Sequence, residues 1–265
     1  QLLPVVAEQL QWMPFVNPKL HVPVIKFIYW SIRQLDMGIQ QHATMTATMR
    51  RLGEDIFKGI GRKGNPHSSS EQPTESKPKS AAFFKSSCVP LRFLSTLIVL
   101  KTVTQVDYLA QALDSLRVDL KTDEGKALFL EYQCVPVILS HLKASSRGLL
   151  SSALDGLLQM TMESDSLQPF LEACSNEFFF RTCSALLRSS KLDIHILEKL
   201  CVLLQKLSRI KSNKKMFELF NLHQMIQELH RTTDPDHAFL CINLNSILLN
   251  LGLCRSNSLS SSLST

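Results

Sequence analysis

Leucine-rich stretches with helical spacing run through most of the chain. In the stretch after Gly148, Leu150, Leu154, Leu157 and Leu158 recur at intervals of three or four residues, which is the spacing of one face of an α-helix. Glycine is scarce, with nine in 265 residues. Helices favour this composition, whereas a β-rich protein needs more glycine turns and more alternation of β-branched and aromatic residues. The pattern therefore predicts an all-α protein.

Short sequences recur at a nearly constant interval. The tripeptide CVP at residues 88–90 returns at residues 134–136, an offset of 46, and ALDSL at 112–116 returns as ALDGL at 153–157, an offset of 41. Periods of about 40 to 47 residues are typical of armadillo and HEAT repeats. One such unit cannot bury its apolar face alone, so we expect the units to stack.

Residues 129–164, FLEYQCVPVILSHLKASSRGLLSSALDGLLQMTMES, resemble one armadillo repeat. The resemblance implies a short first helix ending near Tyr132, a second helix starting at Val135 and Pro136, and a longer third helix. The fold class it implies is an all-α, armadillo/HEAT-like right-handed α-solenoid of about five irregular repeats. The remaining units are expected at residues 2–59, 87–120, 167–210 and 213–252.

The domain organisation follows from composition. Residues 61–85 begin GRKGNPHSSSEQPTESKPKS, which cannot bury enough apolar area to offset chain entropy, so we expect a disordered insertion. It separates N-terminal helical repeats at 1–60 from armadillo-like repeats at 86–254. A disordered serine-rich tail is expected at 255–265. Serines in the insertion are candidate phosphorylation sites, although a plain linker is the simpler interpretation.

Glycines and caps predict where individual helices begin and end. Gly53, Gly148 and Gly252 are expected to stop helices. Asp234 before Pro235 is expected to cap the start of the last helix, because aspartate is a preferred N-cap and proline a preferred first residue.

Cysteines, charge and hydropathy indicate the cellular setting. The seven cysteines include no Cys-x-x-Cys pair, and no Asn-x-Ser/Thr sequon occurs, which fits a reducing, cytoplasmic compartment. No apolar run approaches the roughly 18 to 20 residues that cross a bilayer, so no membrane insertion is expected. Because the helical pattern begins directly after Gln1, we expect the chain to be part of a longer protein.

Several patterns that could carry chemistry lack the necessary context. Residues 59–64 match Gly-x-Gly-x-x-Gly, but a nucleotide site needs a strand before it and a helix after it. His223 and His230 lie seven residues apart, whereas zinc-binding helices use spacings of three or four. No nucleophile motif or carboxylate pair stands out. We therefore predict no catalytic residue, cofactor or metal, and no enzyme.

The third helices carry the candidate binding surface. Their polar positions form the predicted protein-binding set: Gln111, Asp114, Ser115, Ser152, Asp155, Gln159, Gln205, Asn243 and Asn245. Armadillo proteins that bind extended peptides carry an asparagine ladder where this chain has Ser115 and Gly156, so an importin-like mode is disfavoured. A helix in a groove or a surface contact fits better. These positions are equally explained as ordinary solvated residues.

A cluster of cations falls where one repeat passes to the next. The basic run consists of Lys206, Arg209, Lys211, Lys214 and Lys215. A solvated turn is the simplest explanation, and a patch for an acidic partner is the alternative. Nucleic acid is disfavoured because no aromatic residues are interleaved. A nucleic-acid module and a structural dimerisation domain remain as rival functions.

A narrower resemblance concerns both ends of the chain. Residues 22–36, VPVIKFIYWSIRQLD, and 237–252, HAFLCINLNSILLNLG, are similar to the C-terminal part of a family of coiled-coil proteins of the centrosome or cilium base. The resemblance implies a coiled coil before Gln1. The stacking of repeats leads to the function hypothesis, a non-enzymatic scaffold that binds protein partners on a concave face.

Overall fold

A computed structural model describes residues 5, 6, 8, 10, 17–35, 43–59, 83–189 and 192–253, and the regular structure within them is entirely helical. The helices form two compact units, residues 1–137 and 138–265, and each unit is described by itself. The predicted all-α, armadillo/HEAT-like fold class is confirmed.

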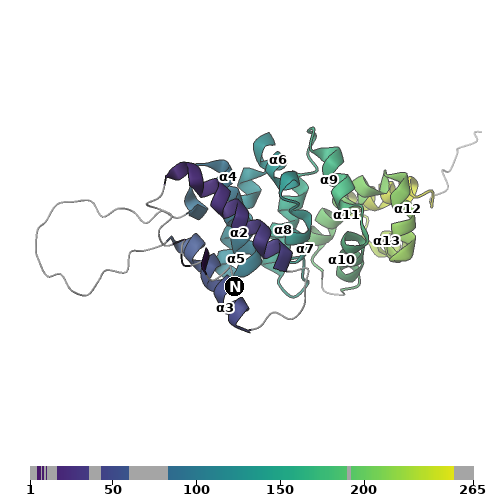
Figure 1. The fold of residues 1–265 in the computed structure, drawn as a ribbon. Helices are drawn as coiled ribbons and strands as arrows, with labels where there is room; N and C mark the ends of the chain where they lie inside the picture. The colour runs from purple at the N-terminus through teal and green to yellow at the C-terminus, as the bar shows by residue number, and fades with distance from the viewer. Residues whose placement is uncertain are drawn as a thin grey trace, which may run out of the picture. The chain divides into compact units, whose positions relative to one another are not determined.

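Unit 1 is built around one central helix. Its elements are η2 (Pro18–Leu20), α2 (His21–Leu35), α3 (Ala43–Lys58), η3 (Phe83–Lys85), α4 (Val89–Thr102), α5 (Val106–Asp119), α6 (Asp123–Glu131) and most of α7 (Val135–Leu139). In Figure 1, α2 lies across α4, and α3, α5 and α6 also pack on α4. Consequently α4 is buried on nearly every side, with Leu94, Leu97 and Ile98 fully enclosed. A helix that is apolar all round belongs inside a core.

The prediction that Gly53 stops a helix is wrong. Gly53 lies inside α3, and a Cβ added there would come within 2.0 Å of the Thr102 hydroxyl oxygen on α4. The glycine is required because α3 and α4 approach closely. The helix ends instead at Lys58, followed by Gly59 in the left-handed conformation (φ +85°).

A buried ion pair joins α4 to α5. Arg92 donates through Nη2 to Asp119 Oδ1 at 2.6 Å and through Nε to both carboxylate oxygens, while Nη1 donates to the Ser86 carbonyl at 2.7 Å. The side chain of Asp119 is only 2% exposed, and that of Arg92 is 25% exposed. The hydrogen bonds that Arg92 donates to Asp119 raise the pKa of the Arg92 guanidinium.

The turn from α5 to α6 is equally tight. Thr122 caps α6 by accepting the backbone N–H of Gly125 at 3.1 Å. A Cβ on Gly125 would lie 2.0 Å from the carbonyl oxygen of Asp119, so only glycine fits at this position.

Most of the predicted insertion, residues 61–85, lies outside the described residues, as does the predicted tail, residues 255–265. The last three residues of the insertion form η3, in which Phe83 and Phe84 are buried. These two phenylalanines therefore belong to the core of unit 1.

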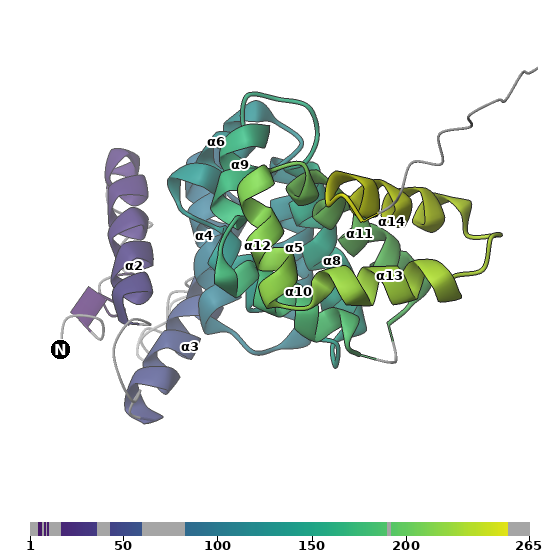
Figure 2. The same ribbon diagram turned by 90° about the vertical axis from the view of Figure 1, so that its right-hand side faces the viewer.

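Unit 2 repeats a pattern of shorter helices followed by one long helix. Its elements are α8 (Arg147–Gln159), α9 (Leu167–Cys174), α10 (Glu177–Leu187), α11 (Ile194–Ser208), η4 (Lys211–Asn213), α12 (Lys214–Leu219), α13 (Leu222–Thr232) and α14 (Ala238–Asn250). The long helices α8, α11 and α14 begin at residues 147, 194 and 238, so they recur at the expected repeat spacing. Helix α11 packs against both α8 and α14, as Figure 2 shows.

The boundaries of these long helices differ partly from expectation. Gly148 does not stop a helix but lies in the first turn of α8. Asp234 is not the N-cap of the last helix: its carboxylate accepts the N–H of Asp236 in a turn, and α14 begins only at Ala238. The prediction for Gly252 is confirmed, because it follows α14 with φ +75°.

No described helix combines the length and the hydrophobicity needed to cross a membrane.

Candidate partner-binding surface

A polar row crosses from α8 to α11 in unit 2. Lys199 on α11 donates to Asp155 Oδ1 at 2.7 Å and to Ser151 Oγ at 2.8 Å, both on α8. The side chains of Lys199 and Asp155 are 24% and 34% exposed. A half-exposed ion pair contributes at most about 1 kcal/mol to stability, so its main effect is to fix the positions of these groups.

A second polar contact joins α11 to α14 on the other side of α11, since Ser208 lies nine residues after Lys199 and so about 180° around the helix. Asn250 on α14 donates to Ser208 Oγ on α11 at 2.9 Å. Asn243 lies seven residues before Asn250 and therefore on the same side of α14, where it is half-buried. Asn245 is about 200° from Asn243 around the helix, so the structure does not bring these two predicted residues together.

We use the name third-helix face for the polar residues of α8, α11 and α14 that make or adjoin these two contacts. Gln159 of α8 and Gln205 of α11 are half-exposed, as is Ser152. The face is defined by Ser151, Ser152, Asp155, Gln159, Lys199, Gln205, Asn243 and Asn250. Five of these eight residues were predicted from the sequence.

The other predicted residues lie on α5 in unit 1. Gln111 and Asp114 are exposed, and Asp114 pairs with Arg117 one turn later at 3.6 Å. Ser115 is half-buried and receives a long hydrogen bond, 3.5 Å, from the Thr96 hydroxyl on α4. Ser115 thus faces its own core helix more than solvent.

Sequence reasoning missed Lys199, which joins the two helices. Lys199 falls 47 residues after Ser152, so the repeat offset could have placed it at a third-helix position. Nothing in the local pattern separates it from a solvated lysine, because its partners are Ser151 and Asp155 on another helix.

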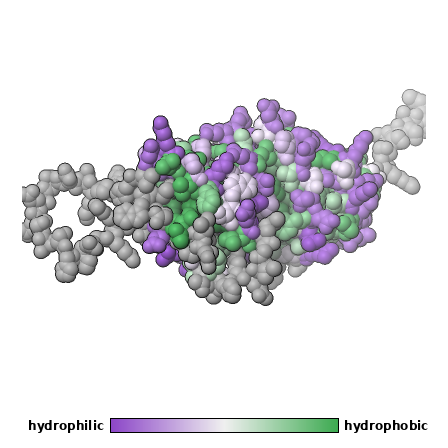
Figure 3. Space-filling view, in the orientation of Figure 1, coloured by the Kyte–Doolittle hydropathy of each residue, from purple (hydrophilic) through white to green (hydrophobic). Residues whose placement is uncertain are grey.

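Exposed apolar side chains adjoin the polar residues on α14. Phe239, Ile242 and Leu249 are 55%, 64% and 50% exposed. Ile242 and Leu249 are seven residues apart and therefore share one side of the helix. In Figure 3 the visible part of unit 2 is mainly hydrophilic with small separate apolar areas. Apolar groups set beside polar ones are typical of protein-binding surfaces.

The basic run extends from the end of α11 into α12. Arg209, Lys211, Lys214 and Lys215 are exposed, and Lys206 is half-exposed. Among the described residues, no carboxylate forms an ion pair with any of the five. Lys206 lies seven residues after Lys199, so the run begins on the third-helix face.

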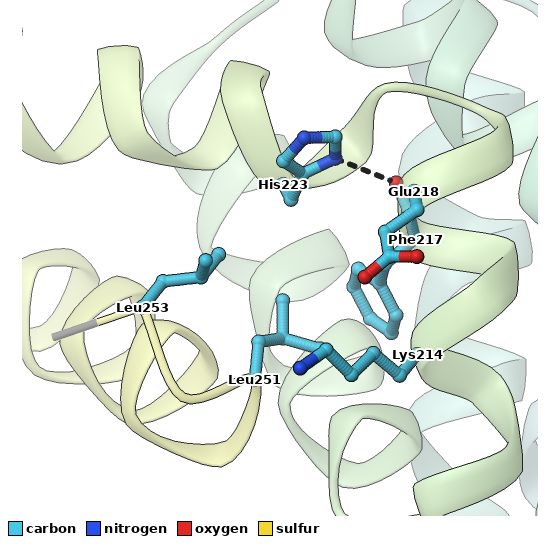
Figure 4. Close-up of a pocket in the computed structure, with 6 residues that line it drawn as sticks. All are labelled: Lys214, Phe217, Glu218, His223, Leu251 and Leu253. Atoms are coloured by element: carbon cyan, nitrogen blue, oxygen red, sulfur yellow. Dashed lines mark hydrogen bonds between the residues drawn. The ribbon is translucent and has the colours of Figure 1, made fainter.

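A pocket of about 290 Å³ opens beside the basic run. Figure 4 shows its lining residues: Lys214, Phe217 and Glu218 of α12, His223 of α13, and Leu251 and Leu253 after α14. His223 is fixed by a 3.1 Å contact between its Nδ1 and the Phe217 carbonyl oxygen. The pocket thus combines the apolar side chains of Phe217, Leu251 and Leu253 with the charged side chains of Lys214 and Glu218.

Within the described part of the chain, no group of three histidine, cysteine or acidic residues could hold a metal ion. His223 and His230 both lie on α13, but they do not belong to any such group. Gly59, the first glycine of the Gly-x-Gly-x-x-Gly match, follows helix α3 and not a strand. The rest of that match lies outside the described residues.

The buried cysteines have a structural role. Burial raises the pKa of the thiols of Cys134, Cys174, Cys183 and Cys201, in the last case to about 12. A thiol that stays protonated in an apolar surround is a poor nucleophile.

These features define an all-α helical-repeat domain with an interhelical polar face. The family model for the C-terminal domain of coiled-coil domain-containing protein 138 matches residues 1–251. The chain therefore belongs to this family. The human protein of that name is 72% identical over 264 residues and the mouse protein 68% identical, each across the whole chain. The chain spans about 40% of the length of these relatives.

A designed armadillo repeat protein of known structure is also similar, with 9% identity and a TM-score of 0.47 over 84% of this chain and 99% of that one. The fold class follows from the helices described above and not from this likeness.

Proposed function

We propose that the chain is a non-enzymatic interaction domain that binds protein partners through the third-helix face of unit 2. The observation that carries the proposal is the packing of α11 between α8 and α14, with the Lys199–Asp155 ion pair on one side of α11 and the Asn250–Ser208 hydrogen bond on the other. Fixed, half-exposed polar groups supply direction and specificity at an interface, because their positions do not have to be ordered on binding.

The neighbouring apolar side chains favour a protein partner. Phe239, Ile242 and Leu249 leave at least half of their side chains in water, and covering them provides a hydrophobic contribution to binding. Aromatic and aliphatic anchors within a polar surround are typical of interface centres. A helix of the partner lying along the face would contact both kinds of group.

The family membership supports the wider setting. Relatives more than twice as long carry the coiled-coil description in their name, so we propose that the domain is a module of a longer coiled-coil scaffold. We further propose a location at the centrosome or cilium base, on the family resemblance. Imaging a tagged full-length protein together with a centriole marker tests the location.

Two matched variants test the binding face. Gln159→Arg with Gln205→Arg places two long cations on the third-helix face, where both glutamines are half-exposed. The control is Gln224→Arg with Gln227→Arg, which makes the same change at exposed positions of α13. Circular dichroism checks that both proteins remain folded.

Proximity labelling with the full-length protein gives the readout. We expect a defined set of labelled proteins to be lost with the third-helix variant and retained with the α13 control. Equal labelling by both variants would show that the face is not the binding surface.

A further inference from the structure

We propose that the pocket beside the basic run binds one apolar side chain of an acidic peptide segment, whose carboxylates lie on Lys211, Lys214 and Lys215. The proposal goes beyond the third-helix face and does not depend on it. We call the pocket together with these three lysines the α12 site.

Part of the wall of the α12 site is apolar, and it is packed firmly against the core of unit 2. The Phe217 ring is fully buried and packs edge-on against Phe180, with ring centroids 5.2 Å apart. Leu251 is 3% exposed, whereas Leu253 at the mouth is 39% exposed. An apolar side chain entering the pocket would therefore meet carbon on several sides and would cover the exposed part of Leu253.

The main chain on both sides of the pocket is held in place. Before α12, Asn213 donates to Ser175 Oγ and to the Leu207 carbonyl. After it, the Ser184 hydroxyl donates to the Phe220 carbonyl at 2.9 Å. A pocket with fixed walls binds without a large ordering cost.

The end of α14 sets the position of the mouth. Gly252 adopts φ +75°, and the N–H of Leu253 donates back to the Leu248 carbonyl at 2.9 Å. This reversal turns the chain so that Leu253 lines the pocket together with Leu251.

The volume limits what can enter. Pockets for drug-sized ligands and cofactors measure roughly 300–1,000 Å³, and this one, at about 290 Å³, falls just below that range. A single large side chain is a better match than a whole cofactor.

The charges around the α12 site indicate which residues flank the inserted side chain in the peptide. From Lys206 to His223 the sequence holds five lysines and arginines but only one carboxylate, Glu218. Lys214 and Glu218 both line the pocket, yet no ion pair joins them in the described structure. The excess of exposed cations is complementary to a peptide rich in aspartate and glutamate.

A peptide is favoured over nucleic acid because the site has a pocket with an apolar wall and no exposed aromatic residue for base stacking. It is favoured over a membrane because two exposed leucines, Leu219 of α12 at 63% and Leu253 at 39%, give little apolar area to insert.

The test selects peptides from a random 12-residue library displayed on phage, with the full chain as bait. We expect the selected sequences to carry aspartate and glutamate around one leucine, isoleucine, methionine or phenylalanine. The affinity of a synthetic selected peptide, measured by fluorescence anisotropy, should fall as salt rises.

Three variants locate the binding. Reversing the charges together in Lys211→Glu, Lys214→Glu and Lys215→Glu should weaken the selected peptide at least about tenfold. Leu253→Trp, which changes a half-exposed residue at the mouth, should weaken it by a similar factor by filling the pocket. Arg147→Glu, a charge reversal at an exposed residue of α8, should have no effect.

The proposal is overturned if no peptide is selected, if the selected peptides lack acidic residues, or if the charge and pocket variants bind normally. It is also overturned if a single-stranded DNA 20-mer or phosphatidylserine vesicles bind more tightly than the peptide and depend on the same three lysines. A dimer abolished by Leu253→Trp would instead assign the pocket to a second copy. Gln159→Arg with Gln205→Arg should leave peptide binding unchanged, which separates this test from that of the third-helix face.

Discussion

Replacing Arg92 by alanine removes the only cation that pairs with Asp119 in the described structure. The Asp119 side chain, 2% exposed, would then be buried without a cationic partner. The same substitution also removes the hydrogen bond to the Ser86 carbonyl. The structure therefore predicts a loss of stability well beyond that of a surface ion pair.

The expected cost is about 3–5 kcal/mol, the range for breaking a buried pair by deleting one partner. Asp119→Ala should cost less, about 1–3 kcal/mol, because Arg92 is 25% exposed and can turn its guanidinium toward water. Replacing both residues by leucine should cost less than Arg92→Ala alone, because no charge is then left buried.

Tryptophan fluorescence during urea unfolding measures this effect selectively. The chain has two tryptophans; Trp30 lies on α2 in unit 1, which contains the ion pair, and Trp12 lies outside the described residues. The urea curve followed by fluorescence therefore reports the unfolding of unit 1, whereas circular dichroism reports the loss of helix in both units.

Equal costs for Arg92→Ala and Asp119→Ala, both below about 1 kcal/mol, would refute this reasoning. Such a result would mean that water reaches Asp119 and that the pair acts as an exposed one. A double-leucine variant less stable than Arg92→Ala would equally contradict the assignment of the cost to a stranded charge.

Two further predictions concern glycines and thiols. Gly125→Ala should destabilise unit 1 by about 2 kcal/mol or more in urea unfolding, because its Cβ would clash with the Asp119 carbonyl. Gly148→Ala has open space around the new Cβ, so it should be neutral or stabilising by up to about 1 kcal/mol. Equal effects of the two would contradict the close approach at Gly125. Burial raises the pKa of Cys201 from 9.0 to about 12, so its contribution to stability is intact below pH 9 and is lost as pH rises from 9 to 12. Between pH 8 and 10.5 the free energy of unfolding should fall less steeply with pH for Cys201→Ala than for the unmodified chain, by about 1 kcal/mol per pH unit. An unchanged slope would indicate that the Cys201 thiol is accessible to water.

The sequence predicts the long helices of unit 2 well because their signal is local. Leu150, Leu154 and Leu157 fall on one side of a helix, and the same side is buried in α8. The repeat offset then places α11 and α14 without any knowledge of their contacts. The family resemblance is confirmed for the same reason, since it rests on the residues themselves.

The errors arise where one local signal has two causes. Gly53 looks like a helix stop, but its missing side chain allows α3 to approach α4 closely. The contact is with Thr102, which is distant in sequence, so the residues around Gly53 could not predict it. Asp234 before Pro235 resembles a helix start, yet the same two residues are equally common in turns. The structure has a turn at this position.

The candidate surface was only partly predictable because it depends on pairs across helices. Gln159 and Gln205 could be placed from the repeat, but the role of Lys199 needs Asp155, which is 44 residues away in sequence and on another helix. The pocket at α12 could not be predicted at all, because its lining residues come from three separate elements.

The central position of α4 has a consequence for the order in which unit 1 can form during synthesis. Helices α2 and α3 both pack on α4, yet α4 begins about 50 residues after α2 ends. At about 5–20 residues per second, a ribosome would deliver α2 roughly 3–10 seconds before its packing partner. Throughout that interval the packing partner α4, which covers the side of α2 with Ile25, Ile28 and Ile32, is not yet synthesised. The apolar side of α2 is therefore synthesised well before the helix that covers it in the folded unit.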